Sequence, residues 1–334
     1  MQDKNKEYAD IVSIIIPCFN EEDCIEEMFA RVIAVFEGIP LETYEVVLVD
    51  DRSTDSTWNK IAELGNQNPQ VTAIRLTRNH GHQLAVTAGL MTCIGYRALV
   101  LDADLQDPPE LLLPMMEIMD DGADVVYGQR QSRAGETWFK RKSAELYYKT
   151  LNVFSETPMP PNTGDFRLIN RRTIELLRAM PERQRYVRGI ISWLGLDQRP
   201  LLYDRAARFS GKTKYSMSRM FGLALNGITS FSIIPLRFAS ALGFAMFAIS
   251  MMLMIHVFYS WYFLGAVSGW TSMMTVVLLV GGVQLLVLGI IGEYVGRIFI
   301  EVKQRPIFLV DQIIRDGKQV PPSSAAPEQA RNFE

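Results

Sequence analysis

Two carboxylates and an amide stand close enough in the chain to bind one ligand together. Asp102, Asp104 and Gln106 follow the apolar run at residues 98–101 and come shortly before a Pro-Pro pair. A short apolar run bounded by proline is typical of a buried strand, so these side chains are expected just past its carboxyl end. Their oxygen atoms suit a hard divalent cation, which often shares its ligands with a substrate's phosphates. The alternative is an acidic turn that precedes a helix, and the motif alone leaves both interpretations open.

Two further polar clusters occur where the first two strands of the same pattern are expected to end. They contain Pro17, Phe19 and Glu21 after the first strand, and Asp50 and Asp51 after the second. The carboxyl ends of parallel strands meet at one edge of a sheet, and open α/β sheets bind their ligands there. Three separate helix caps would also explain these residues, but their convergence on one edge favours a binding site.

The N-terminal part of the chain alternates apolar runs with amphipathic stretches. Strands are expected at residues 11–16, 45–49, 71–76, 98–101 and 124–127. Helices are expected between them at residues 22–36, 56–64, 83–93 and 109–119. This alternation predicts an α/β fold with a mostly parallel, Rossmann-like sheet.

A long uncharged segment follows this region. The chain has 334 residues, of which 48% are hydrophobic, and its formal net charge is -3. No Asp, Glu, Lys or Arg occurs from Phe238 to Gly292, although about a quarter of the residues in an ordinary globular domain are charged. We expect two transmembrane helices at residues 236–264 and 270–291, since each stretch is long enough to cross a bilayer. A buried helical hairpin in a soluble core is the alternative.

Basic residues flank the two expected spans. Arg219 precedes the first span and Arg237 lies at its start, and Arg297, Lys303 and Arg305 follow the second. Positive flanks remain on the cytoplasmic side of a membrane. Residues 1–215 are therefore expected to form a cytoplasmic domain of a multi-pass membrane protein.

The segments beside the spans have their own patterns. Interfacial amphipathic helices are expected at residues 216–235 and 297–314. The end of the chain, residues 315–334, is expected to be disordered. His256 and Gln284 lie within the spans, where polar side chains often face a partner helix, and this favours a homo-oligomer.

Further motifs add to the three strand-end clusters. They lie at residues 78–83, 163–167 and 210–216, with a last one at residues 292–297 that ends the two-helix hairpin. Together these motifs resemble family 2 glycosyltransferases of the GT-A type over residues 10–312. Within that family the chain is most similar to a subgroup that contains dolichol-phosphate mannose synthases and bacterial polyprenyl-phosphate glycosyltransferases, among them the bactoprenol glucosyltransferases.

The resemblance implies an enzyme that transfers one sugar, with inversion, from a nucleotide diphosphate sugar to a polyprenyl phosphate. It implies UDP-glucose and undecaprenyl phosphate as substrates, Mg²⁺ or Mn²⁺ as cofactor, and the cytoplasmic face of the bacterial inner membrane as location. No nucleic-acid partner is expected. Within the subgroup, the alternative is an enzyme that uses GDP-mannose or UDP-4-amino-arabinose. A processive polysaccharide synthase is a more distant alternative. A non-catalytic membrane scaffold is an alternative from a different functional class.

The same resemblance implies roles for individual residues. The nucleotide pocket would contain Pro17, Phe19, Glu21, Asp50, Asp51, Asp102 and Ala103. The metal ion would be held against the diphosphate by Asp102, Asp104 and Gln106. Arg52 departs from the family pattern, in which glycine is commoner at this position. The difference affects the expected backbone conformation of the turn after Asp51 but not the expected role of Asp51.

Basic side chains are the candidates for binding phosphate groups. Arg130 comes directly after the fifth expected strand and would contact the diphosphate as a catalytic cation, or it belongs to a solvated basic loop with Arg133. Arg205, Lys212 and Lys214 precede the first interfacial segment and would bind the acceptor phosphate, or hold the chain to anionic lipids.

Five other side chains have more than one interpretation. Asp165 would orient the sugar or acceptor, or balance nearby arginines. It is less suited to act as a general base, because a phosphate monoester is already mostly ionised near neutral pH. His80 and His82 have no further ligand at the spacing of a zinc site, so a structural or nucleotide-loop role is expected. Arg185 and Arg188 face either the active site or the membrane.

Overall fold

A computed structural model describes residues 11–37, 44–130, 163–183, 185–204, 234–264 and 269–322. These residues form two compact units. The first unit contains the described strands and shorter helices, including the strands near the end of the chain, and the second contains two long apolar helices. The expected α/β fold class, with a pair of long apolar helices near the end of the chain, is confirmed.

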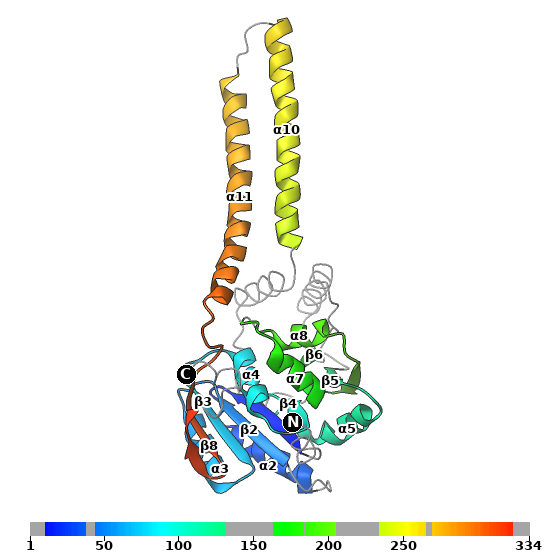
Figure 1. The fold of residues 1–334 in the computed structure, drawn as a ribbon, viewed down its shortest axis with the longest axis vertical. Coiled ribbons are helices and arrows are strands. Elements are labelled where there is room, and N and C mark those ends of the chain that lie inside the picture. The colour runs from blue at the N-terminus through cyan, green and yellow to red at the C-terminus, as the bar shows by residue number, and fades with distance from the viewer. Residues whose placement is uncertain are drawn as a thin grey trace. The chain divides into compact units, whose positions relative to one another are not determined.

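The first unit is built on a 9-stranded mixed sheet (Figure 1). Its strands are β1 (Val12–Cys18), β2 (Tyr44–Asp50), β3 (Val71–Leu76), β4 (Arg97–Val100), β5 (Val125–Arg130), β6 (Thr163–Asn170), β7 (Gln198–Tyr203), β8 (Val310–Arg315) and β9 (Lys318–Val320). They lie in the order β7-β5-β6-β4-β1-β2-β3-β8-β9. The central strands β4, β1, β2 and β3 are parallel, as the alternating pattern predicts, whereas β6, β8 and β9 pair antiparallel with their neighbours.

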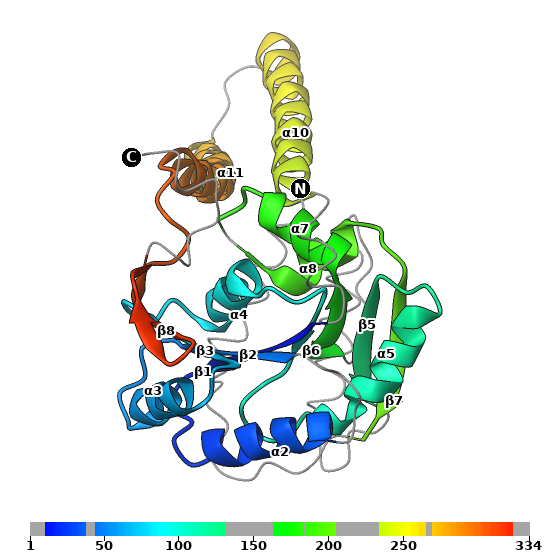
Figure 2. The ribbon, with the colours of Figure 1, turned by 60° about the horizontal axis from the view of Figure 1, so that its bottom comes forward.

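Helices cover both faces of this sheet (Figure 2). They are α2 (Ile25–Glu37), α3 (Thr57–Gln67), α4 (His82–Thr92), α5 (Leu112–Asp120), α7 (Arg171–Ala179) and α8 (Val187–Trp193), with a 3₁₀ turn at Pro109–Leu111. Helices α2 and α3 lie on one face and α4 lies on the other. Ile14 and Ile16 of β1 belong to the buried cluster formed with α2, α3 and α5. Cover on both faces explains why β1 is apolar apart from Ser13 and is buried along its whole length.

The antiparallel strand β6 is the main feature of the sheet that the sequence pattern did not predict. It inserts between β4 and β5, and Val100 of β4 pairs with Arg167 of β6. Continuing this register past the end of β4 places Asp165 opposite Asp102. The inserted strand therefore brings two acidic residues that are distant in sequence to the same edge of the sheet.

The end of the chain corrects two expectations. Residues 297–314 do not form an interfacial helix, because the preceding helix ends within them and β8 then pairs with β3. The tail expected to be disordered from residue 315 begins with a β-hairpin, so the first unit is not limited to residues 1–215. Asp316 and Gly317, which have φ values of 52° and 67°, form the tight turn that an Asp-Gly pair favours between antiparallel strands.

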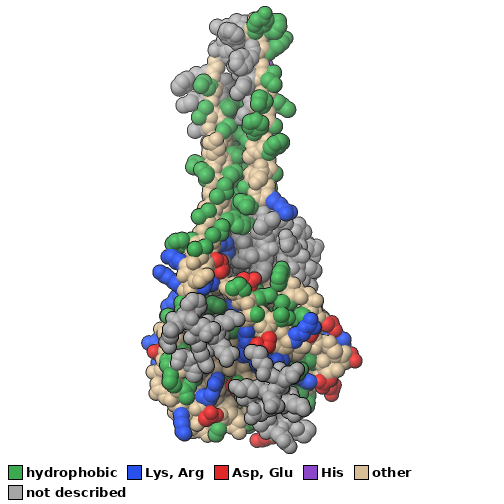
Figure 3. Space-filling view, in the orientation of Figure 1, with side chains coloured by type: hydrophobic (Ala, Val, Ile, Leu, Met, Phe, Trp, Pro, Cys, Tyr) green, Lys and Arg blue, Asp and Glu red, His purple; other side chains and the backbone are tan. Residues whose placement is uncertain are grey.

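The second unit consists of α10 (Ile234–Leu264) and α11 (Trp270–Val302). Many of their apolar side chains are exposed, and Figure 3 shows hydrophobic groups over the surfaces of these helices. Each contains a stretch long and apolar enough to cross a membrane, at Leu236–Leu253 and Leu279–Val302.

Both helices extend beyond the expected spans, α10 by two residues at its start and α11 at its end. Helix α11 continues past residue 291 through Glu293 and Arg297, whose side chains form an ion pair along the helix (2.9 Å). The interfacial helix expected at residues 216–235 lies outside the described residues, apart from its last two, which begin α10.

Glu45 is buried at the end of the sheet opposite to the expected binding edge. Its carboxylate accepts hydrogen bonds from Ser13 Oγ (2.7 Å), from the Ile94 backbone N–H (2.9 Å) and from Thr72 Oγ1 (3.3 Å). Burial raises the pKa of Glu45 above its ordinary value, and these hydrogen bonds oppose the shift. One buried carboxylate thus cross-links the amino-terminal ends of β1, β2 and β3.

We expect Glu45→Gln to keep the fold, because its amide oxygen accepts from Ser13 and Ile94 while its NH₂ group donates to Thr72. Glu45→Leu leaves the Ile94 N–H without an acceptor and should cost about 1–3 kcal/mol of unfolding free energy. Because the folded-state pKa is raised, the wild type loses stability as the pH rises through that pKa, and Glu45→Gln does not. Urea titrations near pH 5 and pH 8 test this, and an equal loss of stability at the higher pH in the wild type and in Glu45→Gln would contradict it.

Candidate active site

The loops after β1 and β2 are held together by hydrogen bonds at the carboxyl edge of the sheet. The Asn20 N–H donates to Ser53 Oγ (3.0 Å), and the Thr54 N–H donates to Asn20 Oδ1 (2.8 Å). The Glu21 N–H donates to Thr57 Oγ1 (2.9 Å) at the start of α3. The first two polar clusters therefore converge as expected, and backbone and side-chain groups between them fix the arrangement.

The other residues expected to line a nucleotide pocket differ in exposure. Pro17 and Ala103 are buried, whereas the Phe19 side chain is exposed just beyond β1. An exposed aromatic ring at the ligand-binding edge of a sheet is available to stack on a planar group.

Asp51 joins the loop after β2 to the loop that precedes α4. Its carboxylate oxygens accept hydrogen bonds from the backbone N–H groups of His80 (2.6 Å) and Gly81 (2.8 Å). The neighbouring Asp50 is fully buried and accepts from the Ser53 N–H (3.1 Å). Burial raises the pKa of both carboxyl groups, and these hydrogen bonds oppose the shift. Asp51 thereby fixes the turn at the start of α4.

Arg52 has the backbone conformation that explains the glycine of the family pattern. Its φ of 60° lies in the left-handed region, which is uncommon for residues other than glycine. The turn therefore holds an arginine in a conformation that glycine adopts readily. The Arg52 guanidinium forms an ion pair with Asp311 of β8, with 2.6 Å between Nη1 and Oδ2.

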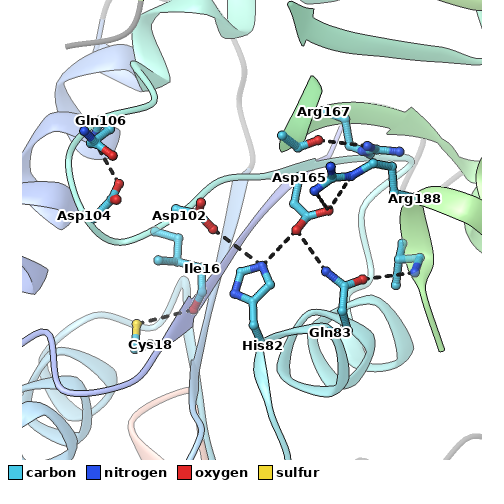
Figure 4. Close-up of polar contacts among 12 residues, drawn as sticks. Ile16, Cys18, His82, Gln83, Asp102, Asp104, Gln106, Asp165, Arg167 and Arg188 are labelled. Atoms are coloured by element: carbon cyan, nitrogen blue, oxygen red, sulfur yellow. Dashed lines mark hydrogen bonds and ion pairs between the residues drawn. The ribbon is translucent and has the colours of Figure 1, made fainter. Parts of the chain in front are cut away.

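The loop after β4 separates the three expected metal ligands into two groups (Figure 4). Asp104 Oδ1 accepts a hydrogen bond from the Gln106 N–H (3.2 Å). The Asp102 carboxylate faces His82 instead, with 3.6 Å between Oδ1 and Nε2. Leu105 has a φ of 61°, which gives the loop its sharp turn. The structure therefore places these side chains in one loop without gathering them around one point.

The donor atoms nevertheless fit a hard divalent cation. Asp102 Oδ1 is a buried atom without a hydrogen bond, and the candidate ligands are all carboxylate or amide oxygens. Burial, opposed by His82 and reinforced by neighbouring carboxylates, raises the pKa of Asp102 to about 6, and a bound cation would reverse that shift. In the part of the chain that the structure describes, no three His, Cys, Asp or Glu side chains gather as a metal site. A cation held here would complete its shell with oxygens from phosphate or water, as Mg²⁺ does.

Asp165 is the acceptor on which three donors converge (Figure 4). Its Oδ2 accepts from Gln83 Nε2 (2.9 Å) and lies 3.1 Å from His82 Nε2, while its Oδ1 pairs with Arg188 Nη2 (3.2 Å). Burial alone would raise the pKa of Asp165, but Arg188 and His82 outweigh it and hold this pKa well below its usual range. Asp165 is therefore a weak base that stays ionised and accepts these hydrogen bonds near neutral pH.

His82 lies between the carboxylates of Asp102 and Asp165. Burial disfavours the charged imidazole, but the hydrogen bond to Asp165 and the charge of Asp102 raise the pKa of His82 to about 9. The ring is therefore protonated at neutral pH, and it supplies a positive charge between two acidic groups.

Arg188 and Gln83 are site residues whose roles the sequence left undecided or unassigned. Gln83 Oε1 accepts the Val187 N–H (3.0 Å) and so ties the start of α8 to α4. Arg188 faces Asp165, whereas the buried Arg185 donates to the backbone carbonyls of Leu177, Met180 and Glu182. The motif at residues 78–83 signalled this turn, but only the tertiary contacts identify which side chains meet Asp165.

Arg130 lies at the end of β5 in a network beside the same edge. Tyr203 of β7 pairs with it across the strands, and the Tyr203 hydroxyl donates to Asp107 Oδ1 (2.6 Å). The Arg130 guanidinium interacts with this tyrosine and packs against Gly164, where a Cβ atom would come within 3.1 Å of Nη2. Packing therefore fixes Arg130, in contrast to the solvated basic loop that was its alternative.

The residues expected to bind the acceptor phosphate, Arg205, Lys212 and Lys214, lie outside the described residues, and so does Arg133. Their roles stay predictions.

Comparisons with known proteins decide the family. The model for Glycosyl transferase family 2 matches residues 13–177, and the model for the GtrB C-terminal hairpin matches residues 234–298. An uncharacterized glycosyltransferase of Synechocystis sp. is 40% identical over 303 residues, which cover 90% of this chain and 95% of that protein. The chain belongs to glycosyl transferase family 2.

Other relatives of this glycosyltransferase have more specific names. The SfII prophage-derived bactoprenol glucosyl transferase of Shigella flexneri is 37% identical over 300 residues, covering 90% of this chain and 97% of that protein. The prophage bactoprenol glucosyl transferase homolog of Escherichia coli is 36% identical over 308 residues, covering 90% of this chain and 99% of that protein. The similarity therefore extends over both the sheet domain and the apolar hairpin.

We expect Asp165→Ala to lower the unfolding free energy of this glycosyltransferase by about 2–4 kcal/mol, because it removes the carboxylate that pairs with the Arg188 charge and leaves this guanidinium only neutral acceptors such as the Thr163 carbonyl oxygen. Arg188→Ala should cost a similar amount, and the double variant should cost clearly less than the sum, since it removes both charges. Asp121→Ala, which breaks an exposed pair with Arg199, is the control and should change little. Denaturant titrations measure these values, and strictly additive losses would contradict the pairing.

Proposed function

We propose that this glycosyltransferase transfers a single glucose from UDP-glucose to undecaprenyl phosphate, with inversion at the anomeric carbon. The reaction would take place at the cytoplasmic face of the bacterial inner membrane. Its product would be a polyprenyl-phosphate sugar used in cell-envelope glycan modification, such as that of O-antigen. The observation that carries the proposal is the similarity to bactoprenol glucosyl transferases, which covers 90% of the chain and includes the apolar hairpin.

The polar clusters at the sheet edge support a site for the nucleotide. We assign the base and ribose to Pro17, Phe19, Glu21, Asp50, Asp51, Asp102 and Ala103. The exposed Phe19 ring would stack on the base or ribose. Each Asp51 oxygen accepts one backbone N–H and retains a second lone pair, which would accept a hydrogen bond from the base.

The loop after β4 supports a site for the diphosphate. Asp102, Asp104 and Gln106 would hold Mg²⁺ or Mn²⁺ there. When bound, such an ion neutralises the charge that develops on the departing nucleoside diphosphate without any proton transfer. Arg130, fixed between Tyr203 and Gly164, would add a further positive charge to the same phosphates.

The acceptor is proposed from the basic segment and the helices that follow it. Arg205, Lys212 and Lys214 would bind the lipid phosphate, whose oxygen attacks the anomeric carbon from the face opposite the leaving group. This displacement inverts the configuration and needs no covalent enzyme intermediate. Helices α10 and α11 would span the membrane, with their basic flanks on the cytoplasmic side. His256 and Gln284, exposed on these helices, support a homo-oligomer.

Asp165 would position the sugar and the cations around it. Its carboxylate is already engaged by three donors, and its pKa lies well below its usual range. The acceptor phosphate is mostly ionised near neutral pH, so little proton transfer is required. We therefore assign Asp165 to orientation of the site and not to general base catalysis.

Purified protein with UDP-glucose and undecaprenyl phosphate is expected to form lipid-linked glucose, which thin-layer chromatography or mass spectrometry detects. Chelation by EDTA should abolish turnover, and Mg²⁺ or Mn²⁺ should restore it. Asp102→Asn and Asp104→Asn should each lower kcat about 100-fold or more, because they remove charged ligands from the diphosphate site. Asp121→Asn, at an exposed position, is the matched control.

A donor panel separates the alternatives. Product from GDP-mannose or UDP-4-amino-arabinose in place of UDP-glucose would change the proposed sugar but keep the reaction. Absence of lipid-linked product with every donor would contradict the proposed function and favour a non-catalytic scaffold.

Replacement of Asp165 distinguishes orientation from base catalysis. Asp165→Asn keeps an oxygen acceptor for Arg188 and should retain most of the turnover, whereas Asp165→Ala removes the acceptor and should lose it. A general base would contribute about 10²–10⁴-fold, and both variants would then lose activity to a similar extent. The measurement is kcat of the two variants across about pH 6–9. This range is chosen because the acceptor phosphate is mostly ionised within it.

A further inference from the structure

A residue near the end of the chain contacts the loop that carries Asp51. Asp311 lies on β8, which follows α11 in the chain, and its Oδ2 is 2.6 Å from Nη1 of Arg52. Arg52 is the residue directly after Asp51, and its backbone is held in the left-handed region with a φ of 60°. A side chain that is anchored at its far end restricts the orientations open to such a turn.

The same segment also supports the second loop that Asp51 contacts. Strand β8 pairs antiparallel with β3, and the Thr77 N–H just beyond β3 donates to the carbonyl oxygen of Leu309 (2.9 Å). Thr77 begins the loop that leads to His80 and Gly81, whose N–H groups bind Asp51. The two loops joined by Asp51 are therefore both attached to the C-terminal segment.

Strand β8 is itself firmly docked on the sheet domain. The side chains of Ile313 and Ile314 are buried, and Ile314 packs against Gly65 of α3, where a Cβ atom would lie 3.3 Å from it. The strand therefore provides a fixed base for the ion pair. Both members of the pair are about two-fifths exposed, so the pair adds little to the free energy of unfolding. Its main effect is to orient the Arg52 side chain and the turn that carries it.

We propose that Asp311 is a positioning residue for nucleotide binding, which acts through Arg52 to fix the loop that carries Asp51. The strand that follows the second apolar helix is thus part of the nucleotide-binding edge. This inference rests on the proposed function for the identity of the ligand, a uridine diphosphate group. By linkage, a nucleotide that needs the ordered loop also stabilises the docked state of β8.

The test measures UDP binding by calorimetry and steady-state kinetics with UDP-glucose, using the full-length protein. Asp311→Asn should raise the Kd for UDP and the KM for UDP-glucose about two- to five-fold with unchanged kcat, the range that an exposed ion pair supplies. Arg52→Gly, which keeps the turn but removes the guanidinium, should have the same effect. The double variant should be no worse than either single one.

Three further variants or conditions make the test specific. Asp311→Glu keeps the carboxylate and should restore binding. Asp316→Asn, in the turn that follows β8, removes the same charge away from Arg52 and should bind UDP as the wild type does. The difference between wild type and Asp311→Asn should shrink as the salt concentration rises, because an exposed pair is screened.

Hydrogen exchange provides an independent readout. UDP should slow exchange of the amides of residues 310–315 in the wild type, and should slow it less in Asp311→Asn. Equal UDP affinity in wild type and Asp311→Asn, or an equal loss in Asp316→Asn, would overturn the positioning role. Failure of the wild type to bind either UDP or UDP-glucose would overturn the proposed function, and this inference with it.

Discussion

The carboxylate of Asp165 holds together elements that would otherwise repel one another at the binding edge. His82 and Gln83 approach it from the start of α4, and Arg188 approaches it from α8. Without this acceptor, a protonated imidazole, a guanidinium and an amide N–H would face each other in a partly desolvated space. A buried cation without its counter-charge is strongly destabilising, so the positions of both helix starts depend on this one group.

Charge is unevenly distributed along the same edge. Carboxylates follow β1, β2 and β4, whereas the guanidinium groups of Arg130, Arg167 and Arg188 come from β5, β6 and α8, with the Asp165 carboxylate of β6 among them. Burial lowers the pKa of Arg167 to about 10, so that it still carries its charge at neutral pH. A ligand with several negative charges would therefore be attracted to the Arg130 side of this edge and would need an additional cation beside the carboxylates that follow β4. On the proposed function, this ligand is a nucleoside diphosphate beside a phosphate acceptor, and the additional cation is the divalent metal ion.

Much of the sheet was predictable because parallel strands buried on both faces are continuous apolar runs. That pattern located β1 to β5 and the polar residues that follow β1, β2 and β4. It did not locate β6, because the pairing of an antiparallel strand is decided by its neighbours in space and not by its own composition. The partners of Asp165 were undetermined for the same reason, since His82 and Arg188 meet only after β6 has inserted beside β4.

The hairpin of β8 and β9 has a local signal in the sequence. Asp316-Gly317 is a strong turn pattern with Ile313 and Ile314 before it and Val320 after it, but the basic and apolar residues after Arg297 favoured a helical interpretation. The order of these elements along the chain has a consequence for folding. The side of β3 that pairs with β8 has no partner strand until both apolar helices and then β8 have been synthesised. An open strand edge can pair with other chains. Completion of the sheet, and with it the ion pair between Arg52 and Asp311, therefore requires a segment that is synthesised after the apolar hairpin.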